Sequence, residues 1–166
     1  MIQRPLGIFI VCCLIPLALA YTAIKLEWLP EHTTNHGQFL QSELRIPHFQ
    51  ASDDTLWTIA INAPDSCKSQ CDAQFEALKN LYVALGKHQK DVALAVLNRT
   101  TEEFSLNNYL NYGLDAKLRP ASLYLVDHRG LIVLQYQYFN DEEKNRIEHK
   151  GLLKDLKKLL KYARSS

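Results

Sequence analysis

The sequence lacks the motifs of several large enzyme classes. Its 166 residues contain no glycine-rich phosphate loop and no nucleophile elbow, so we do not expect a nucleotide-binding protein, a kinase or a hydrolase. Its 19 lysines and arginines nearly cancel its 18 aspartates and glutamates, so no basic surface for nucleic acid is predicted. There is also no repeat period and no low-complexity tract. These absences leave one small globular domain of ordinary composition.

Cysteine is scarce, and its positions are informative. Of four cysteines, Cys12 and Cys13 lie in an apolar N-terminal stretch, where we expect them to pack as small apolar residues. Only Cys67 and Cys71 remain for the rest of the chain. A disulfide between them would close a very short loop, and the stabilisation by a disulfide grows with loop length. The pair is therefore better suited to redox chemistry or metal binding than to holding the fold together.

The N-terminal segment predicts a membrane anchor over residues 1–29. Arg4 is followed by about twenty residues without a charge, which is enough to span a bilayer. The tripeptide at residues 18–20, Ala-Leu-Ala, leaves cleavage by signal peptidase as the alternative. We favour an uncleaved transmembrane helix because apolar residues continue beyond the tripeptide. Arg4 lies in the short segment ahead of the apolar stretch, which predicts a cytoplasmic N-terminus. The domain would then face the periplasm from a bacterial inner membrane.

The remaining residues predict a polar linker over 30–54 and a single α/β domain over 55–166. The strand-helix-strand spacing around the cysteine pair implies a parallel crossover, and Asp127 to Gly130 form a predicted hairpin turn. Together they predict a central mixed sheet flanked by helices. Strands are expected at 55–62, 92–97, 121–127 and 131–138, and helices at 67–85, within 100–118 and from 151 onward.

The cysteine pair is expected to open a helix. Ser66 is the predicted N-cap, which places Cys67 in the first turn, where the helix dipole favours a thiolate. Cys71 lies one turn further on, so the two Cα atoms should be about 6 Å apart, within the range of a disulfide. That distance is near the long end of the range and predicts some strain. Two thiolates in this arrangement could equally bind Cu(I).

The order of elements is that of a thioredoxin-like fold, and the chain resembles a known family. Residues 55–162 resemble membrane-anchored thioredoxin-like proteins, in particular the Sco/SenC copper chaperones of cytochrome c oxidase assembly. The resemblance is carried by Cys67-Lys-Ser-Gln-Cys71 and by the strand Leu123-Tyr-Leu-Val-Asp with Gly130 after it. It implies a protein client such as an oxidase subunit or a copper chaperone.

The chain departs from the Sco pattern at one position. A Sco protein has a histidine ahead of the strand that corresponds to 121–127, and this histidine completes a copper site with two cysteines. Here that position is Arg119, which cannot ligate a metal. Pro120 resembles the cis-proline that faces the cysteines of thioredoxins, although a plain strand-entry proline is the alternative. If it faces them, Arg119 would lower the pKa of the thiols. His149, placed just ahead of the last helix, is the spare metal ligand.

Three functions remain open from the sequence. In the first, the protein is a thiol–disulfide oxidoreductase that needs no cofactor: Cys67 reacts, Cys71 resolves the mixed disulfide and Arg119 assists electrostatically. In the second, Cys67 and Cys71 carry copper with a third donor from His149 or a client. In the third, the protein is a non-enzymatic assembly factor that docks on a membrane partner. Whether it is an enzyme is therefore not decided by the sequence.

Overall fold

The computed structural model describes residues 3–25, 35–50, 55–99, 109–114 and 117–163. It divides into two units, Met1–Thr34 and Asn35–Ser166. The first unit contains helix α1, Gln3–Lys25, on which apolar side chains such as Phe9 are exposed. No helix among the described residues is long and apolar enough to cross a membrane, so the transmembrane span predicted over 1–29 is not found.

The second unit is built on a six-stranded mixed sheet with the strand order β1-β6-β5-β2-β3-β4. Strands β2, β3 and β4 run parallel, whereas β5, β6 and β1 pair antiparallel. The predicted mixed sheet, its parallel crossover and its hairpin are thereby confirmed. The strands are β1 Gln38–Phe39, β2 Trp57–Asn62, β3 Val92–Leu97, β4 Tyr109–Tyr112, β5 Leu123–Asp127 and β6 Ile132–Tyr136.

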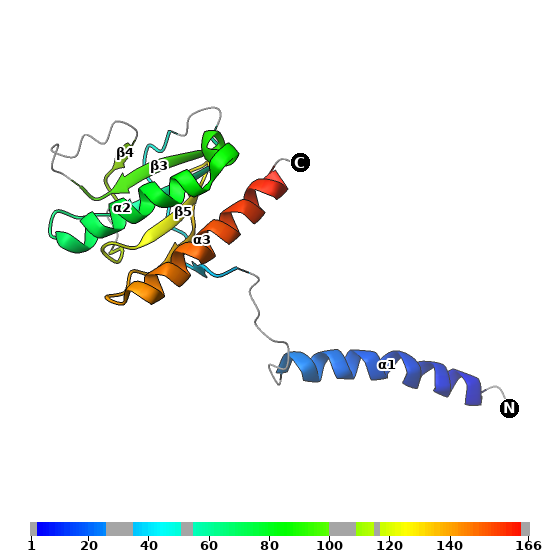
Figure 1. Cartoon of the computed structure of the whole chain (residues 1–166). Helices are drawn as coiled ribbons and strands as arrows, with labels where there is room; N and C mark the ends of the chain where they lie inside the picture. The colour runs from blue at the N-terminus through cyan, green and yellow to red at the C-terminus, as the bar shows by residue number, and fades with distance from the viewer. Residues whose placement is uncertain (1–2, 26–34, 51–54, 100–108, 115–116, 164–166) are drawn as a thin grey trace. The chain divides into compact units, whose positions relative to one another are not determined.

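Two helices cover one face of this sheet. α2, Ser69–Ala84, and α3, Glu142–Ala163, lie side by side across it (Figure 1). Apolar residues of both helices form a continuous core with the strand residues beneath them. Gly86, with φ +56°, follows the C-cap of α2 and leads into a short 3-10 helix, Gly86–Asp91. The helix end predicted at residue 85 is confirmed, and the left-handed conformation of the next residue favours glycine there.

The opposite face of the sheet is covered in part by residues 35–50, which the sequence placed in the linker. Ile46 is buried in a second core cluster with Tyr124 and Val126, and Phe49 packs against this cluster. β1 pairs with β6, and the Ile46 N–H donates to the carbonyl of Gly130, 2.9 Å away. These residues therefore belong to the domain, which starts at Asn35 rather than at residue 55.

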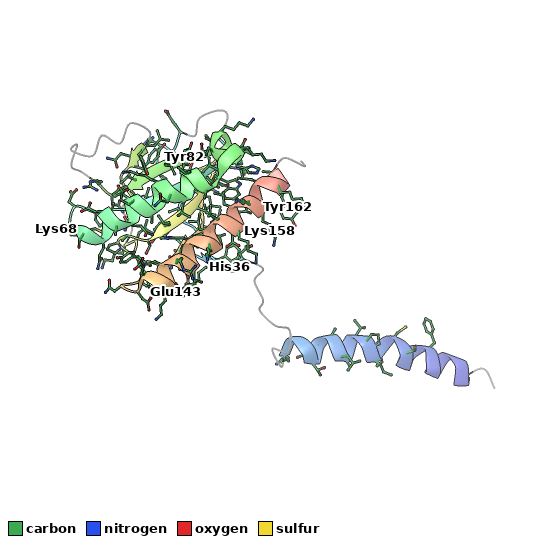
Figure 2. All side chains as sticks on the ribbon, viewed as in Figure 1. His36, Lys68, Tyr82, Glu143, Lys158 and Tyr162 are labelled. Atoms are coloured by element: carbon green, nitrogen blue, oxygen red, sulfur yellow. A yellow bond between two sulfur atoms is a disulfide. The ribbon has the colours of Figure 1, made fainter. Side chains whose placement is uncertain are left out.

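A buried carboxylate holds the start of the domain in place. Asp155 of α3 is 1% exposed, and its Oδ2 accepts the N–H groups of His36 and Gly37 at 2.7 and 2.9 Å and the hydroxyl of Tyr136 at 2.9 Å. His36 lies beside α3 (Figure 2), with Nδ1 3.6 Å from the other carboxylate oxygen. A Cβ at Gly151 would lie 2.7 Å from the Cβ of His36, so this helix position requires glycine.

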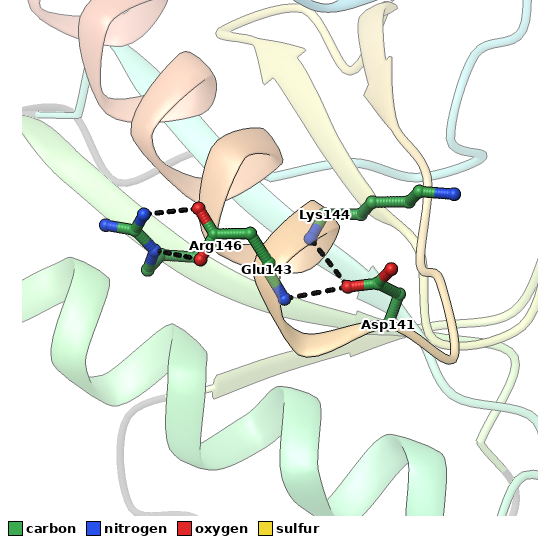
Figure 3. Close-up of polar contacts among 4 residues, drawn as sticks. All are labelled: Asp141, Glu143, Lys144 and Arg146. Carbon is green, nitrogen blue, oxygen red and sulfur yellow. Dashed lines mark hydrogen bonds and ion pairs between the residues drawn. The ribbon is translucent and has the colours of Figure 1, made fainter.

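Helix α3 begins well ahead of its predicted start. Asp141 is its N-cap: Oδ1 accepts the N–H groups of Glu143 at 3.0 Å and Lys144 at 3.2 Å (Figure 3). An aspartate cap with acidic residues in the first turn is a recognised start signal. Gly151 was mistaken for the start, whereas it serves the close approach of His36. As a consequence, His149 lies inside α3 and not ahead of it.

The helix predicted within 100–118 is contradicted in part. Residues 109–112 form β4, in which Tyr109 pairs with Leu94 and Leu110 with Ala95 of β3. The exposed edge of β3 supplies a hydrogen-bonding partner, which favours an extended chain over a helix. Residues 100–108 and 115–116 lie outside the described part of the chain.

Candidate redox site

Cys67 and Cys71 are joined by a disulfide at the end of β2. Their Cα atoms are 5.6 Å apart, close to the predicted distance. This separation is a common one for disulfides, so the strain expected from a long separation is not supported. The short loop that the bond closes adds little to stability, and its placement at a helix start is typical of reactive pairs.

The helix starts later than predicted. The first residue of α2 is Ser69, and its N-cap is Lys68, which makes no side-chain capping bond. Ser66 is therefore not the cap. The Cys67 N–H donates to the carbonyl of Pro64, 2.8 Å away, so this stretch is a turn that leads from β2 into the helix. Cys67 thus lies just ahead of the positive end of the helix.

The two sulfurs differ in their accessibility. Cys71 is 0% exposed and belongs to the main core cluster, whereas Cys67 is only partly buried and packs against the edge of that cluster. The Sγ of Cys71 lies 3.8 Å from the carbonyl oxygen of Asn62. In the reduced state the Cys71 thiol can donate a weak hydrogen bond to this oxygen. We therefore expect an incoming thiol to attack Cys67 rather than Cys71.

Asn62 ties together the segments around the disulfide, and sequence reasoning missed it. It is the last residue of β2 and is 2% exposed. Its Nδ2 donates to the carbonyl of Leu118 at 3.0 Å, and its Oδ1 accepts the side-chain amide of Asn98 at 2.9 Å. Its carbonyl oxygen accepts the N–H of Ala121 at 2.8 Å. A polar residue that ends an apolar strand was the signal available in the sequence.

Arg119 directly follows Leu118, whose carbonyl accepts a hydrogen bond from Asn62 at the end of β2. Its N–H donates to the hydroxyl of Tyr124 at 3.1 Å, and its Nη1 donates to Oε1 of Gln137 at 2.7 Å. The peptide bond before Pro120 is trans, because none of the described peptide bonds is cis. The electrostatic help of Arg119 to the cysteines stays a prediction.

His149 of α3 is hydrogen-bonded to a side chain of α2. Its Nε2 lies 3.1 Å from Oε1 of Gln74, a residue that is 3% exposed. Burial lowers the pKa of His149, so the imidazole is neutral. Over the ranges that the structure describes, no three His, Cys, Asp or Glu side chains are grouped closely enough to bind a metal. Within the described part of the chain, no residue therefore completes a copper site with Cys67 and Cys71.

The family of the domain follows from its sequence. Residues 57–163 match the family described as "Transmembrane-like, thioredoxin-like, C-terminal domain", which is more than half of the chain. The chain belongs to this family. The thioredoxin-like fold predicted from the element order is thereby confirmed, and the observed mixed sheet with its helices agrees with it. No sequence among the curated proteins matches the chain.

Three solved structures of Sco proteins resemble the chain weakly. Apo Sco1 from Thermus thermophilus is 15% identical and matches 78% of this chain and 99% of its own, with a TM-score of 0.49. A SCO1/SenC family lipoprotein from Bacillus anthracis is 15% identical over 64% and 83%, with a TM-score of 0.42. BsSco, a member of the Sco family of cytochrome c oxidase assembly proteins, is 12% identical over 70% and 94%, with a TM-score of 0.39. Likenesses this weak say nothing about the activity of the present domain.

The lowered pKa of His149 predicts how the stability of this thioredoxin-like domain depends on pH. The pKa is below the ordinary value of 6.5, so the unfolded chain takes up a proton first as the pH falls. The free energy of unfolding should therefore decrease as the pH falls through 6.5, with no such penalty above it. Urea unfolding at about pH 7.5 and about pH 5.5 measures this decrease.

The variant His149→Gln is the control for this prediction. Glutamine keeps a hydrogen-bonding side chain opposite Gln74 but does not titrate, so its decrease over the same interval should be smaller. Burial raises the pKa of Glu148 above its ordinary value of 4.5, so this carboxyl group acts in the opposite direction, and it does so in the parent and in the variant alike. An equal decrease in the variant and in the parent would show that His149 is not the cause.

Proposed function

We propose that this domain is a thiol–disulfide exchange protein that acts through Cys67 and Cys71. The proposal rests on one observation: the disulfide has one reachable sulfur at Cys67 and one fully buried sulfur at Cys71. Such asymmetry separates the sulfur that is attacked from the sulfur that leaves. A purely structural bond across so short a loop would contribute little to stability, which also favours a reactive role.

The exchange transfers two electrons from a client dithiol to the disulfide. A client thiolate attacks Sγ of Cys67, the bond between Cys67 and Cys71 breaks, and Cys71 leaves and takes up a proton from solvent. A second client thiolate then attacks the client sulfur of the mixed disulfide and releases Cys67. The client leaves oxidised and the domain is left with two thiols. Arg119, placed in the segment beside the cysteine end, would favour the released thiolate.

The client we propose is a thiol-bearing copper site of an oxidase subunit, or a copper chaperone that serves it. The support is the Cys67-Lys-Ser-Gln-Cys71 motif, which resembles that of Sco proteins. We further propose that residues 1–29 attach the protein to a bacterial inner membrane, with the domain in the periplasm. The apolar side chains that α1 exposes, among them Phe9 and Leu17, support this attachment.

Reduced glutathione tests the reaction directly. The oxidised full chain, kept in detergent, is mixed with excess glutathione and quenched at intervals by acid. Mass spectrometry should show a glutathione adduct at Cys67 that decays to the free dithiol, with no adduct at Cys71. A disulfide that stays intact under these conditions, or an adduct at Cys71, would contradict the proposal.

A further inference from the structure

A groove separates the two helices that cover the sheet. Its volume is about 680 Å³, and its lining comes from α2, from α3 and from the segment that leads into α3. On α2 the wall contains Ala73, Ala77 and Ala84. These lie at positions i, i+4 and i+11, on one face of the helix. Alanine side chains are short, so the backbone of another helix can approach this side of α2 closely.

Part of the groove lining needs no polar partner from an occupant. Leu81, which is 5% exposed, and Leu153 contribute apolar surface. Nε2 of His149 and Oε1 of Gln74 lie 3.1 Å apart, so these two atoms are paired within the domain. An apolar side chain of an occupant can therefore cover this pair without leaving these two atoms unpaired.

The charges differ between the two walls. The α3 wall has Arg146 and Lys150 against Glu142, whereas the charged lining residue on α2 is Glu76. Lys79 already pairs with Glu76 at 2.6 Å, so the α2 side is neutralised. On α3, Arg146 pairs with Glu143, whereas Lys150 forms no ion pair with the described residues, so a carboxylate of the occupant can face Lys150.

We propose that this groove, between Ala73 and Ala84 of α2 and the facing side of α3, docks an amphipathic helix of a client protein. The eleven steps from Ala73 to Ala84 span about 17 Å, or about three helical turns. The client helix has an apolar stripe at helical spacing and an acidic residue toward Lys150. The inference rests on the proposed function: the groove begins shortly after Cys71 along α2, so a cysteine next to the docked helix is brought to Cys67.

Selection from a library of helical peptides tests the docking. The library displays peptides of about three turns with varied apolar and charged positions, and it is applied to the oxidised full chain in detergent. Ala77→Trp fills the groove. Val83→Trp is the matched control, because Val83 is on the same helix, is 69% exposed and does not line the groove. Thermal unfolding of both variants checks that each is folded.

The expected result is a set of peptides with an apolar stripe and an acidic flank. They should bind Ala77→Trp at least about tenfold more weakly than the parent and bind Val83→Trp as the parent does. A Lys150→Glu variant should weaken the same peptides. The proposal is overturned if no peptide is enriched, or if enriched peptides bind Ala77→Trp as well as they bind the parent.

A thiol-exchange measurement connects the groove to the reaction. A cysteine is added to the end of an enriched peptide, and its rate of exchange with the disulfide is compared with that of glutathione. Docking raises the local concentration of the peptide thiol, so the peptide should react faster with the parent and with Val83→Trp, but not with Ala77→Trp. If the peptide exchanges faster than glutathione with Ala77→Trp to the same extent as with the parent, the groove does not bring a client cysteine to Cys67. Failure of glutathione itself would instead refute the proposed function, while the binding result would still decide the docking.

Discussion

Replacing Cys71 by serine should trap partners as stable mixed disulfides at Cys67. In Cys71→Ser the accessible thiol of Cys67 remains and can attack a disulfide, but the resolving thiol is gone, so the adduct persists. With oxidised glutathione as the probe, and with the free, exposed Cys12 and Cys13 replaced by serine in every variant, most of the protein should carry one glutathione. Mass spectrometry of the whole protein under acid quench measures the fraction modified.

The matched control is Cys67→Ser, which keeps one cysteine of the pair. Cys71 is 0% exposed, so its thiol should be modified far more slowly than Cys67 in the first variant. The parent, with both thiols reduced, should show the adduct only transiently because Cys71 resolves it. Equal trapping by the two serine variants would mean that burial does not distinguish the sulfurs and that the assigned roles are wrong.

Removing the carboxylate of Asp155 should destabilise the domain more than any change on its surface. Asp155→Ala leaves the N–H groups of His36 and Gly37 and the hydroxyl of Tyr136 without their acceptor in a buried place. Breaking a buried charged network of this kind costs about 3–5 kcal/mol. Urea unfolding measures the loss, and hydrogen exchange at residues 36 and 37 should show that this part of the domain opens first.

Two further variants make the result interpretable. Asp155→Asn keeps an acceptor oxygen without the charge, so its loss should be smaller than that of Asp155→Ala. Glu143 is an exposed carboxylate on the same helix that pairs with Arg146, and Glu143→Ala should change stability little. If Asp155→Ala unfolds no more easily than Glu143→Ala, the buried carboxylate does not hold the N-terminal part of the domain.

Local patterns in the sequence were sufficient for much of the sheet. The apolar runs of β2 and β3 and the turn from Asp127 to Gly130 identify strands and a hairpin, because burial and turn geometry act over a few residues. The four-residue spacing of Cys67 and Cys71 also predicted a Cα distance close to the observed 5.6 Å, although Cys67 lies in the turn ahead of α2 and not in the helix. The pair that forms the disulfide was therefore identified without the fold, although the start of the helix was predicted two residues early.

Local patterns failed where a distant partner determines the conformation. Residues 109–112 are a strand because the edge of β3 is available to pair with them. Gly151 lies inside α3 because His36 packs against it, whereas glycine at that position predicted a helix start. Residues 35–50 look like a linker in sequence, but the hydrogen bonds to β6 and Asp155 make them part of the domain.

The sequence by itself determined the thioredoxin-like order of elements and a bridgeable distance between Cys67 and Cys71, because both depend on neighbouring residues. Only the tertiary structure decided which sulfur is reachable, which carbonyl faces Cys71 and where His149 binds. It also decided the Asp155 contacts, which join residues 118 and 119 positions apart, and the groove between α2 and α3. These features depend on segments that are distant in the chain and meet only when the sheet and its helices pack.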